Sequence, residues 1–214
     1  MGMAVDYDQK QMRYAQFYNA YVPAYIPAGK TVLDVGCSAG QLGKLLREEK
    51  GCTVYGVDIS PEAVRSAAGV LQAAEVMDVE RDPFPFADHR FQVVLFVDVL
   101  EHLFNPEEVL KKFQNYLTPD GVMVVSIPNV ANISIRLRLL MGRWDYTTSG
   151  ILDEGHVRFY TLKTMRALFH ACGLEIEEQG SAPRYRCKRL TRWWPTLLAN
   201  QFIFVLQPMV RTLG

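Results

Sequence analysis

The 214-residue sequence lacks the patterns that would assign it at once to several large classes of protein. Lysine and arginine together number 23, as do aspartate and glutamate, so no excess of positive charge indicates nucleic acid as a partner. The four cysteines form no C-x-x-C pair, which argues against a zinc ribbon or a disulfide framework and suits a reducing compartment. A basic segment followed by an apolar run is missing at the start, so we expect no signal peptide and a cytoplasmic location.

Long apolar runs are also missing. The longest apolar stretch, 193–210, is interrupted by two prolines and by asparagine and glutamine residues. It therefore predicts no transmembrane helix.

Two phosphate-binding patterns are missing from Thr31–Gly43, TVLDVGCSAGQLG, the segment around which the chain is organised. The segment is typical of a buried strand, a turn of small residues and the first turn of a helix, which lets a ligand approach the backbone. Ser38 and Gln41 replace the second and third glycines of the dinucleotide pattern G-x-G-x-x-G, and no P-loop lysine follows. Asp34, inside the strand, would repel a pyrophosphate and suits a cofactor with a cationic end.

What the chain does contain is an alternation of apolar strands and helical segments. We expect further strands at Thr53–Val57, Ala74–Met77, Phe91–Val97, Val122–Ile127, Leu174–Gln179 and Gln201–Gln207, with a turn at Pro119–Gly121. This alternation predicts an α/β fold, a mostly parallel sheet with helices on both faces. Ligands bind beyond the carboxyl ends of such strands. Polar residues recur there, namely Asp34, Asp58, Asp78, Asp98 and Asn129.

Two segments depart from this alternation. Residues 1–28 are rich in tyrosine at helical spacing, and we interpret them as an N-terminal helical lid, or else as an aromatic face packed on the domain. Residues 130–160 are too long for an ordinary connection and are expected to form a small substrate cap. We expect both to belong to a single domain that spans residues 1–214.

The acids at the strand ends indicate the cofactor. Asp58 ends the second strand, where a carboxylate accepts both hydroxyls of a ribose, and Asp78 follows the third strand, where it can accept the amine of an adenine. An adenosine that carries a cationic amino-acid tail and no phosphate is S-adenosylmethionine.

Five motifs carry a family resemblance: VLDVGCSAG, VYGVDIS, VMDVE, FQVVLFVDVLEHL and GVMVVSIPN. In order and spacing they resemble the motifs of class I S-adenosylmethionine-dependent methyltransferases, from about Thr31 to Gln179. The resemblance implies a Rossmann-like fold of seven strands, the last one antiparallel. It further implies contacts of the methionine end with Asp34, Gly36 and the Cys37 backbone, of the ribose with Asp58, and of the adenine with Ile59, Asp78 and the Val79 backbone, in a pocket lined by the backbone around Phe96.

A longer segment, GRWDYTTSGILDEGHVRFYTLKTMRALFHACGL, is similar to a bacterial small-molecule subgroup associated with the ubiquinone pathway and with polysaccharide assembly. Ubiquinone-pathway O-methyltransferases carry a cluster similar to Asp98, Glu101 and His102 that is linked to a divalent ion. Asp98 has a shorter reach than the glutamate of that cluster. We therefore expect solvated and capping side chains here, and no metal.

His102 is the candidate catalytic residue. It follows the fourth strand near the expected position of the methyl group, and imidazole is suited to removing a proton from a hydroxyl or amine. The alternative is a helix N-terminal residue that hydrogen-bonds to the backbone.

Asn129, His156 and Arg158 are the candidate substrate contacts. Arg158 has an alternative role, in which it ties the cap to the edge of the sheet. The basic segment 184–194, which ends in Trp193 and Trp194, is a candidate for weak contact with a membrane surface or a phosphorylated substrate. Its alternative is a solvated basic loop.

We therefore expect methyl transfer from S-adenosylmethionine to a small molecule, preferentially to oxygen. N-methylation and an RNA substrate are the alternatives, although no RNA-reading module is evident and no nucleic-acid partner is expected. A nicotinamide-dependent oxidoreductase is disfavoured by the glycine pattern and by the lack of a Tyr-x-x-x-Lys motif. A non-catalytic cofactor-binding subunit is disfavoured because the strand-end acids and His102 are present. The sequence does not fix the oligomeric state.

Overall fold

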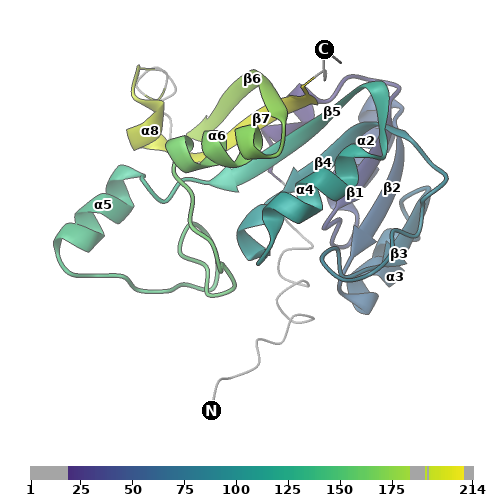
Figure 1. The fold of residues 1–214 in the computed structure, drawn as a ribbon. Coiled ribbons are helices and arrows are strands. Elements are labelled where there is room, and N and C mark those ends of the chain that lie inside the picture. Colours follow the sequence, from purple (N-terminus) through teal and green to yellow (C-terminus); the bar gives the residue numbers. More distant parts are fainter. Residues whose placement is uncertain (1–18, 184–190, 192, 210–214) are drawn as a thin grey trace. The chain divides into compact units, whose positions relative to one another are not determined.

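The computed structural model describes residues 19–183, 191 and 193–209 (Figure 1). Its described strands form a seven-stranded sheet in the order β3-β2-β1-β4-β5-β7-β6. The strands are β1 (Thr31–Val35), β2 (Thr53–Asp58), β3 (Ala73–Val76), β4 (Phe91–Val97), β5 (Leu117–Pro128), β6 (Leu174–Pro183) and β7 (Ala199–Pro208). β1 pairs in parallel with β2 and β4, β2 pairs in parallel with β3, and β6 and β7 are antiparallel. The predicted Rossmann-like architecture, with an antiparallel last strand, is confirmed.

Helices connect the strands. The described helices are α2 (Gln41–Lys50), α3 (Pro61–Ala67), α4 (Pro106–Gln114), α5 (Ile133–Leu140), α6 (Leu162–Ala171) and α8 (Pro195–Leu198), with short 3-10 helices η1 (Val22–Tyr25) and η2 (Leu100–His102). Side chains cap the first turns of α3 and α6. Ser60 caps α3 by accepting from the Ala63 N–H at 3.2 Å, and Thr161 and Thr164 form a capping box at the start of α6.

The chain divides into two compact units, and the single domain over residues 1–214 stays a prediction. The first runs to Val97 and includes Glu108–Val124, and the second comprises Asp98–Glu107 and the chain from Val125 onward. In the first unit the rings of Phe84 and Phe113 meet edge to face, with centroids 5.3 Å apart. In the second unit α6 lies along β6 and β7 (Figure 1), and Phe169 packs on Phe204. Each unit thus has apolar packing of its own.

Two strands match the limits predicted from the sequence, and the other five differ from them at one end or at both. β1 and β4 have the predicted limits, and β3 begins one residue early. The turn predicted at Pro119–Gly121 falls within the range of β5, and the chain does turn there, because a Cβ added to Gly121 would lie 3.0 Å from the backbone N and O of Thr118. Gly121 serves a close backbone approach there, since an added Cβ would lie 2.9 Å from the Phe91 carbonyl oxygen.

Parts of two predicted features, and the end of the chain, lie outside the described residues. These are most of the N-terminal lid (1–18), most of the basic segment (184–190 and 192) and the end of the chain (210–214). Among the helices that the structure does describe, none combines the length and apolar character needed to span a membrane.

Candidate functional site

The loop after β1 is fastened to the end of β2. The N–H groups of Gly36 and Cys37 both donate to the Val57 carbonyl oxygen, at 2.8 and 3.1 Å. The Ser38 N–H donates to Asp58 Oδ2 at 2.8 Å. Ser38 adopts a positive φ of 48°, which is unusual for a residue other than glycine. The amides of Gly36 and Cys37 are therefore already hydrogen-bonded to β2. Together with the Ser38 contact they hold the conformation of the loop without a ligand.

Two buried carboxyls lie at the ends of adjacent strands in this unit. Asp34 and Asp58 are each 3% exposed. Burial is the larger of two causes that raise the pKa of Asp34 to about 7, and the charge of Asp58 is the smaller. Burial also raises the pKa of Asp58, while the backbone N–H groups of Ser60 and Ser38 lower it in part. A bound cation would relieve the cost of ionising both acids, so the pair fits the cationic end and ribose of S-adenosylmethionine.

The remaining predicted cofactor residues differ in what they offer a ligand. The side chain of Ile59 is 50% exposed and open to an adenine ring. Asp78 accepts from the Glu80 N–H at 3.0 Å, so its own loop already engages the carboxylate. The Val79 carbonyl accepts from Lys112 Nζ at 3.2 Å. The side chain of Phe96 is fully buried, which leaves only its backbone for a ligand.

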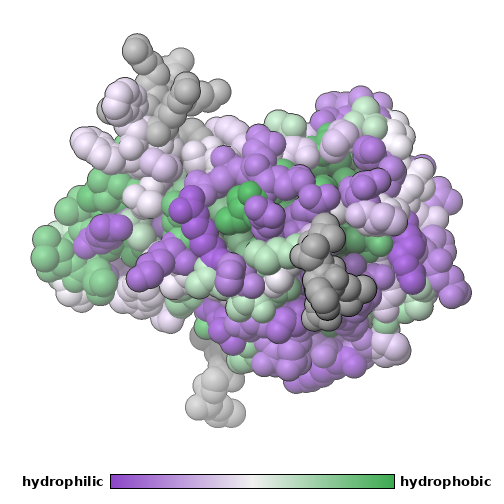
Figure 2. Space-filling model, turned by 45° about the horizontal axis from the view of Figure 1, so that its top comes forward, coloured by the Kyte–Doolittle hydropathy of each residue, from purple (hydrophilic) through white to green (hydrophobic). Residues whose placement is uncertain are grey.

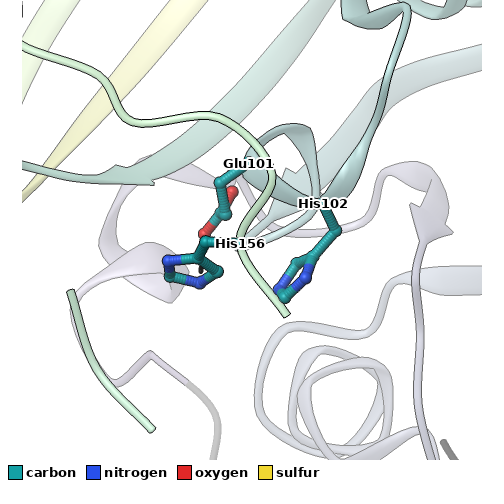
Figure 3. A group of neighbouring side chains, drawn as sticks. All are labelled: Glu101, His102 and His156. Carbon is teal, nitrogen blue, oxygen red and sulfur yellow. Dashed lines mark ion pairs between the residues drawn. The ribbon is translucent and has the colours of Figure 1, made fainter. Parts of the chain in front are cut away.

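A second cluster lies in the other unit, formed by Glu101 and His102 of η2 and by His156 (Figure 3). One ligand atom from each of the three side chains lies within 4.8 Å of the other two. Glu101 Oε1 and His156 Nε2 are 3.9 Å apart, and the two imidazole rings meet edge to face with centroids 4.8 Å apart. The fold thus brings the predicted base and one predicted substrate residue together.

Backbone carbonyls fix the tautomers of both histidines. His102 Nδ1 lies 2.9 Å from the Gly155 oxygen, and His156 Nδ1 lies 3.1 Å from the Ile151 oxygen. A carbonyl oxygen only accepts hydrogen bonds, so each Nδ1 carries the hydrogen. In the neutral rings each Nε2 therefore holds the lone pair, which can take up a proton or bind a metal ion.

Glu101 is the buried acid of this cluster. It is 1% exposed, and neither carboxylate oxygen has a hydrogen-bond partner among the described residues. Burial is the largest cause that raises the pKa of Glu101 well above its usual value, and the charges of Asp98 and Asp153 add to it. Two imidazoles and a carboxylate, with a carbonyl behind each ring, are a donor set that fits a divalent cation.

Asp98 does not belong to this group. Its Oδ1 accepts from Ser126 Oγ at 3.0 Å and from Gln201 Nε2. Its φ is 57°, and burial raises its pKa to about 6. The expectation of solvated side chains at Asp98, Glu101 and His102 is wrong for Glu101, which is buried. His156, and not Asp98, is grouped with Glu101 and His102.

The other predicted substrate residues bind backbone. Asn129 is fully buried, and its Nδ2 donates to the carbonyls of Thr196 and Ala199 at 3.0 and 2.9 Å. Both of its amide hydrogens are thus used to hold the chain between α8 and β7. Arg158 Nε donates to the Phe104 carbonyl at 3.2 Å, which ties it to the loop between η2 and α4.

Sequence reasoning missed Tyr160. Its side chain is 7% exposed, and its hydroxyl has no hydrogen-bond partner in the described part of the chain. Burial is the largest cause of the raised pKa of this phenol, so it stays protonated and can donate a hydrogen bond. An apolar-looking Phe-Tyr pair before a helix gives no sequence signal for such a role.

Comparisons with known proteins agree on a family. A family model described as a methyltransferase domain matches residues 7–179. A ubiquinone biosynthesis O-methyltransferase of Xanthomonas axonopodis pv. citri is 33% identical over 74% of this chain and 68% of its own length. A ubiquinone biosynthesis O-methyltransferase of Neisseria meningitidis is 29% identical over 47% of this chain and 45% of its own length. The solved structure of a TehB-like SAM-dependent methyltransferase from Corynebacterium glutamicum, 18% identical, has a TM-score of 0.61 over 95% of this chain and 96% of its own.

The matches to several curated relatives are partial, and the chain spans about half the length of those proteins. The solved structure, at its low identity, shows a shared fold.

Proposed function

The chain belongs to the methyltransferase domain family, and from that premise we propose that it transfers a methyl group from S-adenosylmethionine to an oxygen of a small molecule. The observation that carries the proposal is the buried pair Asp34 and Asp58 at the ends of β1 and β2. Two carboxyls with raised pKa values favour a ligand that brings positive charge and hydroxyl groups. S-adenosylmethionine has a sulfonium and an ammonium group at one end and a ribose in its middle.

The first unit supplies the cofactor contacts in this proposal. Asp34 interacts with the cationic methionine end and Asp58 accepts the ribose hydroxyls, held in place by the Ser38 N–H. Ile59 packs on the adenine. The sulfonium already activates the methyl group, so the protein mainly orients the acceptor and excludes water.

In the second unit we assign the proton transfer to His102. A hydroxyl must lose its proton as the carbon–oxygen bond forms, and His102 Nε2 bears the lone pair because Nδ1 faces the Gly155 carbonyl. His156 and the hydroxyl of Tyr160 are the polar contacts for the acceptor. A divalent ion held by Glu101, His102 and His156 would instead lower the pKa of an acceptor hydroxyl.

The relatives' names support the choice of acceptor. Several of the matched proteins are named ubiquinone biosynthesis O-methyltransferase, and another is named 2-methyl-6-phytyl-1,4-hydroquinone methyltransferase. We therefore propose a hydroxylated ring as the acceptor class.

Binding and transfer assays test the proposal in sequence. Calorimetry with S-adenosylmethionine, S-adenosylhomocysteine and NAD should show binding of the first two alone. Labelled methyl groups should then appear on ring hydroxyls in a panel of phenols, amines and RNA, with mass spectrometry to identify the product. Binding of NAD alone would refute the family function, and transfer only to amines or RNA would refute the oxygen acceptor.

A chelator distinguishes proton transfer by His102 from metal-assisted chemistry. With His102 as the base, we expect turnover to survive dialysis against EDTA and to be unchanged by added Mg²⁺ or Zn²⁺. Loss of turnover on chelation, restored by one of these ions, would move the chemistry to a metal at Glu101, His102 and His156.

A further inference from the structure

The first part of the predicted cap, around α5, carries an apolar surface that the site does not use. In α5 and the residue after it, the side chains of Leu137, Leu139, Leu140 and Met141 are 51, 57, 85 and 66% exposed. Figure 2 shows apolar residues gathered at the left of the view, where Figure 1 places α5. Four of the five residues 137–141 are large, apolar and exposed to water, which is unfavourable. Contact with an apolar environment would stabilise this surface.

The charges beside this surface are positive. Arg136 and Arg138 lie within α5 and Arg143 follows it, while no acidic residue occurs from Ile133 to Trp144. Arg143 pairs with Asp145 at 3.4 Å. This local excess of positive charge contrasts with a chain whose net charge is zero.

Two exposed tryptophans lie in the same unit, next to α8. Trp193 and Trp194 are 80 and 63% exposed. Asn132, the N-cap of α5, donates to the Ala199 carbonyl at 3.0 Å, directly after α8. The beginning of α5 is thus joined to the end of the tryptophan-bearing segment. Tryptophan favours the boundary between lipid headgroups and acyl chains, because its ring is apolar and its N–H is polar.

From this combination we propose that α5, with Trp193 and Trp194, binds the surface of an anionic lipid bilayer. Leucine and methionine side chains enter the acyl boundary, and the arginines contact lipid phosphates. A second copy of this chain is a poorer occupant. A two-fold contact between α5 surfaces would bring the same arginines against one another with no acidic residue of α5 to pair with them. The inference does not depend on the identity of the methyl acceptor.

Vesicle flotation with the full chain tests the proposal. We expect binding to phosphatidylcholine vesicles that contain phosphatidylglycerol, and weaker binding to phosphatidylcholine alone. Each arginine near an anionic surface contributes about fivefold in affinity, so raising the salt concentration should weaken binding several-fold. Absence of binding to the anionic vesicles would overturn the proposal.

Matched variants locate the surface. Leu139→Gln with Leu140→Gln should reduce vesicle affinity at least about tenfold, and Met141→Gln should reduce it less. Met209→Gln, at a methionine that is 40% exposed after β7, is the control and should bind like the native chain. Circular dichroism and thermal unfolding confirm that each variant folds. Native binding by the folded leucine variant would overturn the proposal, and so would a dimer in sedimentation that this variant dissociates.

Discussion

Asp34 is the residue whose proton most directly links pH to cofactor binding. Its pKa of about 7 compares with 3.8 for an ordinary aspartate. In the unfolded chain the carboxyl ionises near its ordinary value, so its contribution to stability is greatest below about pH 4. That contribution falls as the pH rises to about 7, where the folded form ionises too. A cationic ligand favours the ionised form and therefore competes with the proton.

The affinity for S-adenosylmethionine should consequently rise with pH up to about 7. Below that value Asp34 must release a proton on binding, which weakens the affinity by up to about tenfold per pH unit. Calorimetry from acidic to neutral pH measures this slope. Asp34→Asn should bind weakly with a shallower profile, because Asp58 still ionises, and Asp88→Asn, at an exposed loop residue, should keep the native profile. A flat profile for the native protein would contradict the role of Asp34.

His102 provides a second test at the scale of a single residue. If it accepts the proton from the acceptor, His102→Ala should lower kcat by roughly 10²–10⁴-fold. The cofactor Kd should stay the same, because the proposed cofactor contacts lie on other residues. Steady-state kinetics and calorimetry on the same preparation separate the two effects. His170→Ala, on the exposed side of α6, should leave both unchanged, and an unchanged kcat for His102→Ala would exclude His102 as the base.

At the scale of elements, α5 depends on its N-cap. Asn132 Oδ1 accepts from the Ser134 N–H at 2.9 Å, while Nδ2 donates to the Ala199 carbonyl. Asn132→Ala removes both bonds and leaves a buried carbonyl with fewer partners, so the free energy of unfolding should fall by about 1–3 kcal/mol. Urea denaturation measures the loss. Asn115→Ala, at an exposed asparagine after α4, should cost much less, and equal losses would show that the cap contributes little.

The sequence predicted elements well where one local signal dominated. β1 and β4 are short, mostly apolar segments, and their limits were correct because burial on both faces leaves few other interpretations. Pro119–Gly121 has turn composition, and the chain turns there, but the sequence did not predict that the range of β5 begins before the turn, at Leu117. Strand pairing there depends on neighbouring backbone, and local propensity does not report it.

The same distinction applies to the candidate site. The positions of Asp34 and Asp58 could be predicted because both follow apolar strand residues at one edge of the sheet, while their role stays a prediction. Asn129 carries the same signal, but its amide is used by the carbonyls around α8. His156 joins Glu101 and His102 only through folding, since it comes from a distant part of the chain. A polar residue's type can thus be read from sequence, whereas its partner requires the tertiary structure.

At the scale of the whole molecule, the proposed functions divide between the two units. The cofactor residues Asp34 to Cys37 and Asp58 to Val79 lie in the first unit, and Glu101, His102 and His156 lie in the second. Ligand binding stabilises the part of a protein that makes the contacts, by about 2.7 kcal/mol at a ligand concentration of 100 times Kd. Hydrogen exchange can therefore locate the cofactor independently of catalysis.

With S-adenosylmethionine in excess, exchange should slow in peptides that cover Gly36–Ser38 and Asp58–Ile59, because the amides of Gly36, Cys37 and Ser38 bond to Val57 and Asp58. NAD at the same concentration should leave these peptides unchanged. Asp58→Asn should weaken the protection, since the Ser38 N–H would lose a charged acceptor and the ribose would lose its carboxylate. Glu62→Gln, at an exposed residue of α3, is the matched control and should respond like the native chain. Protection by NAD, or protection confined to the second unit, would mean that the loop after β1 is not the cofactor site.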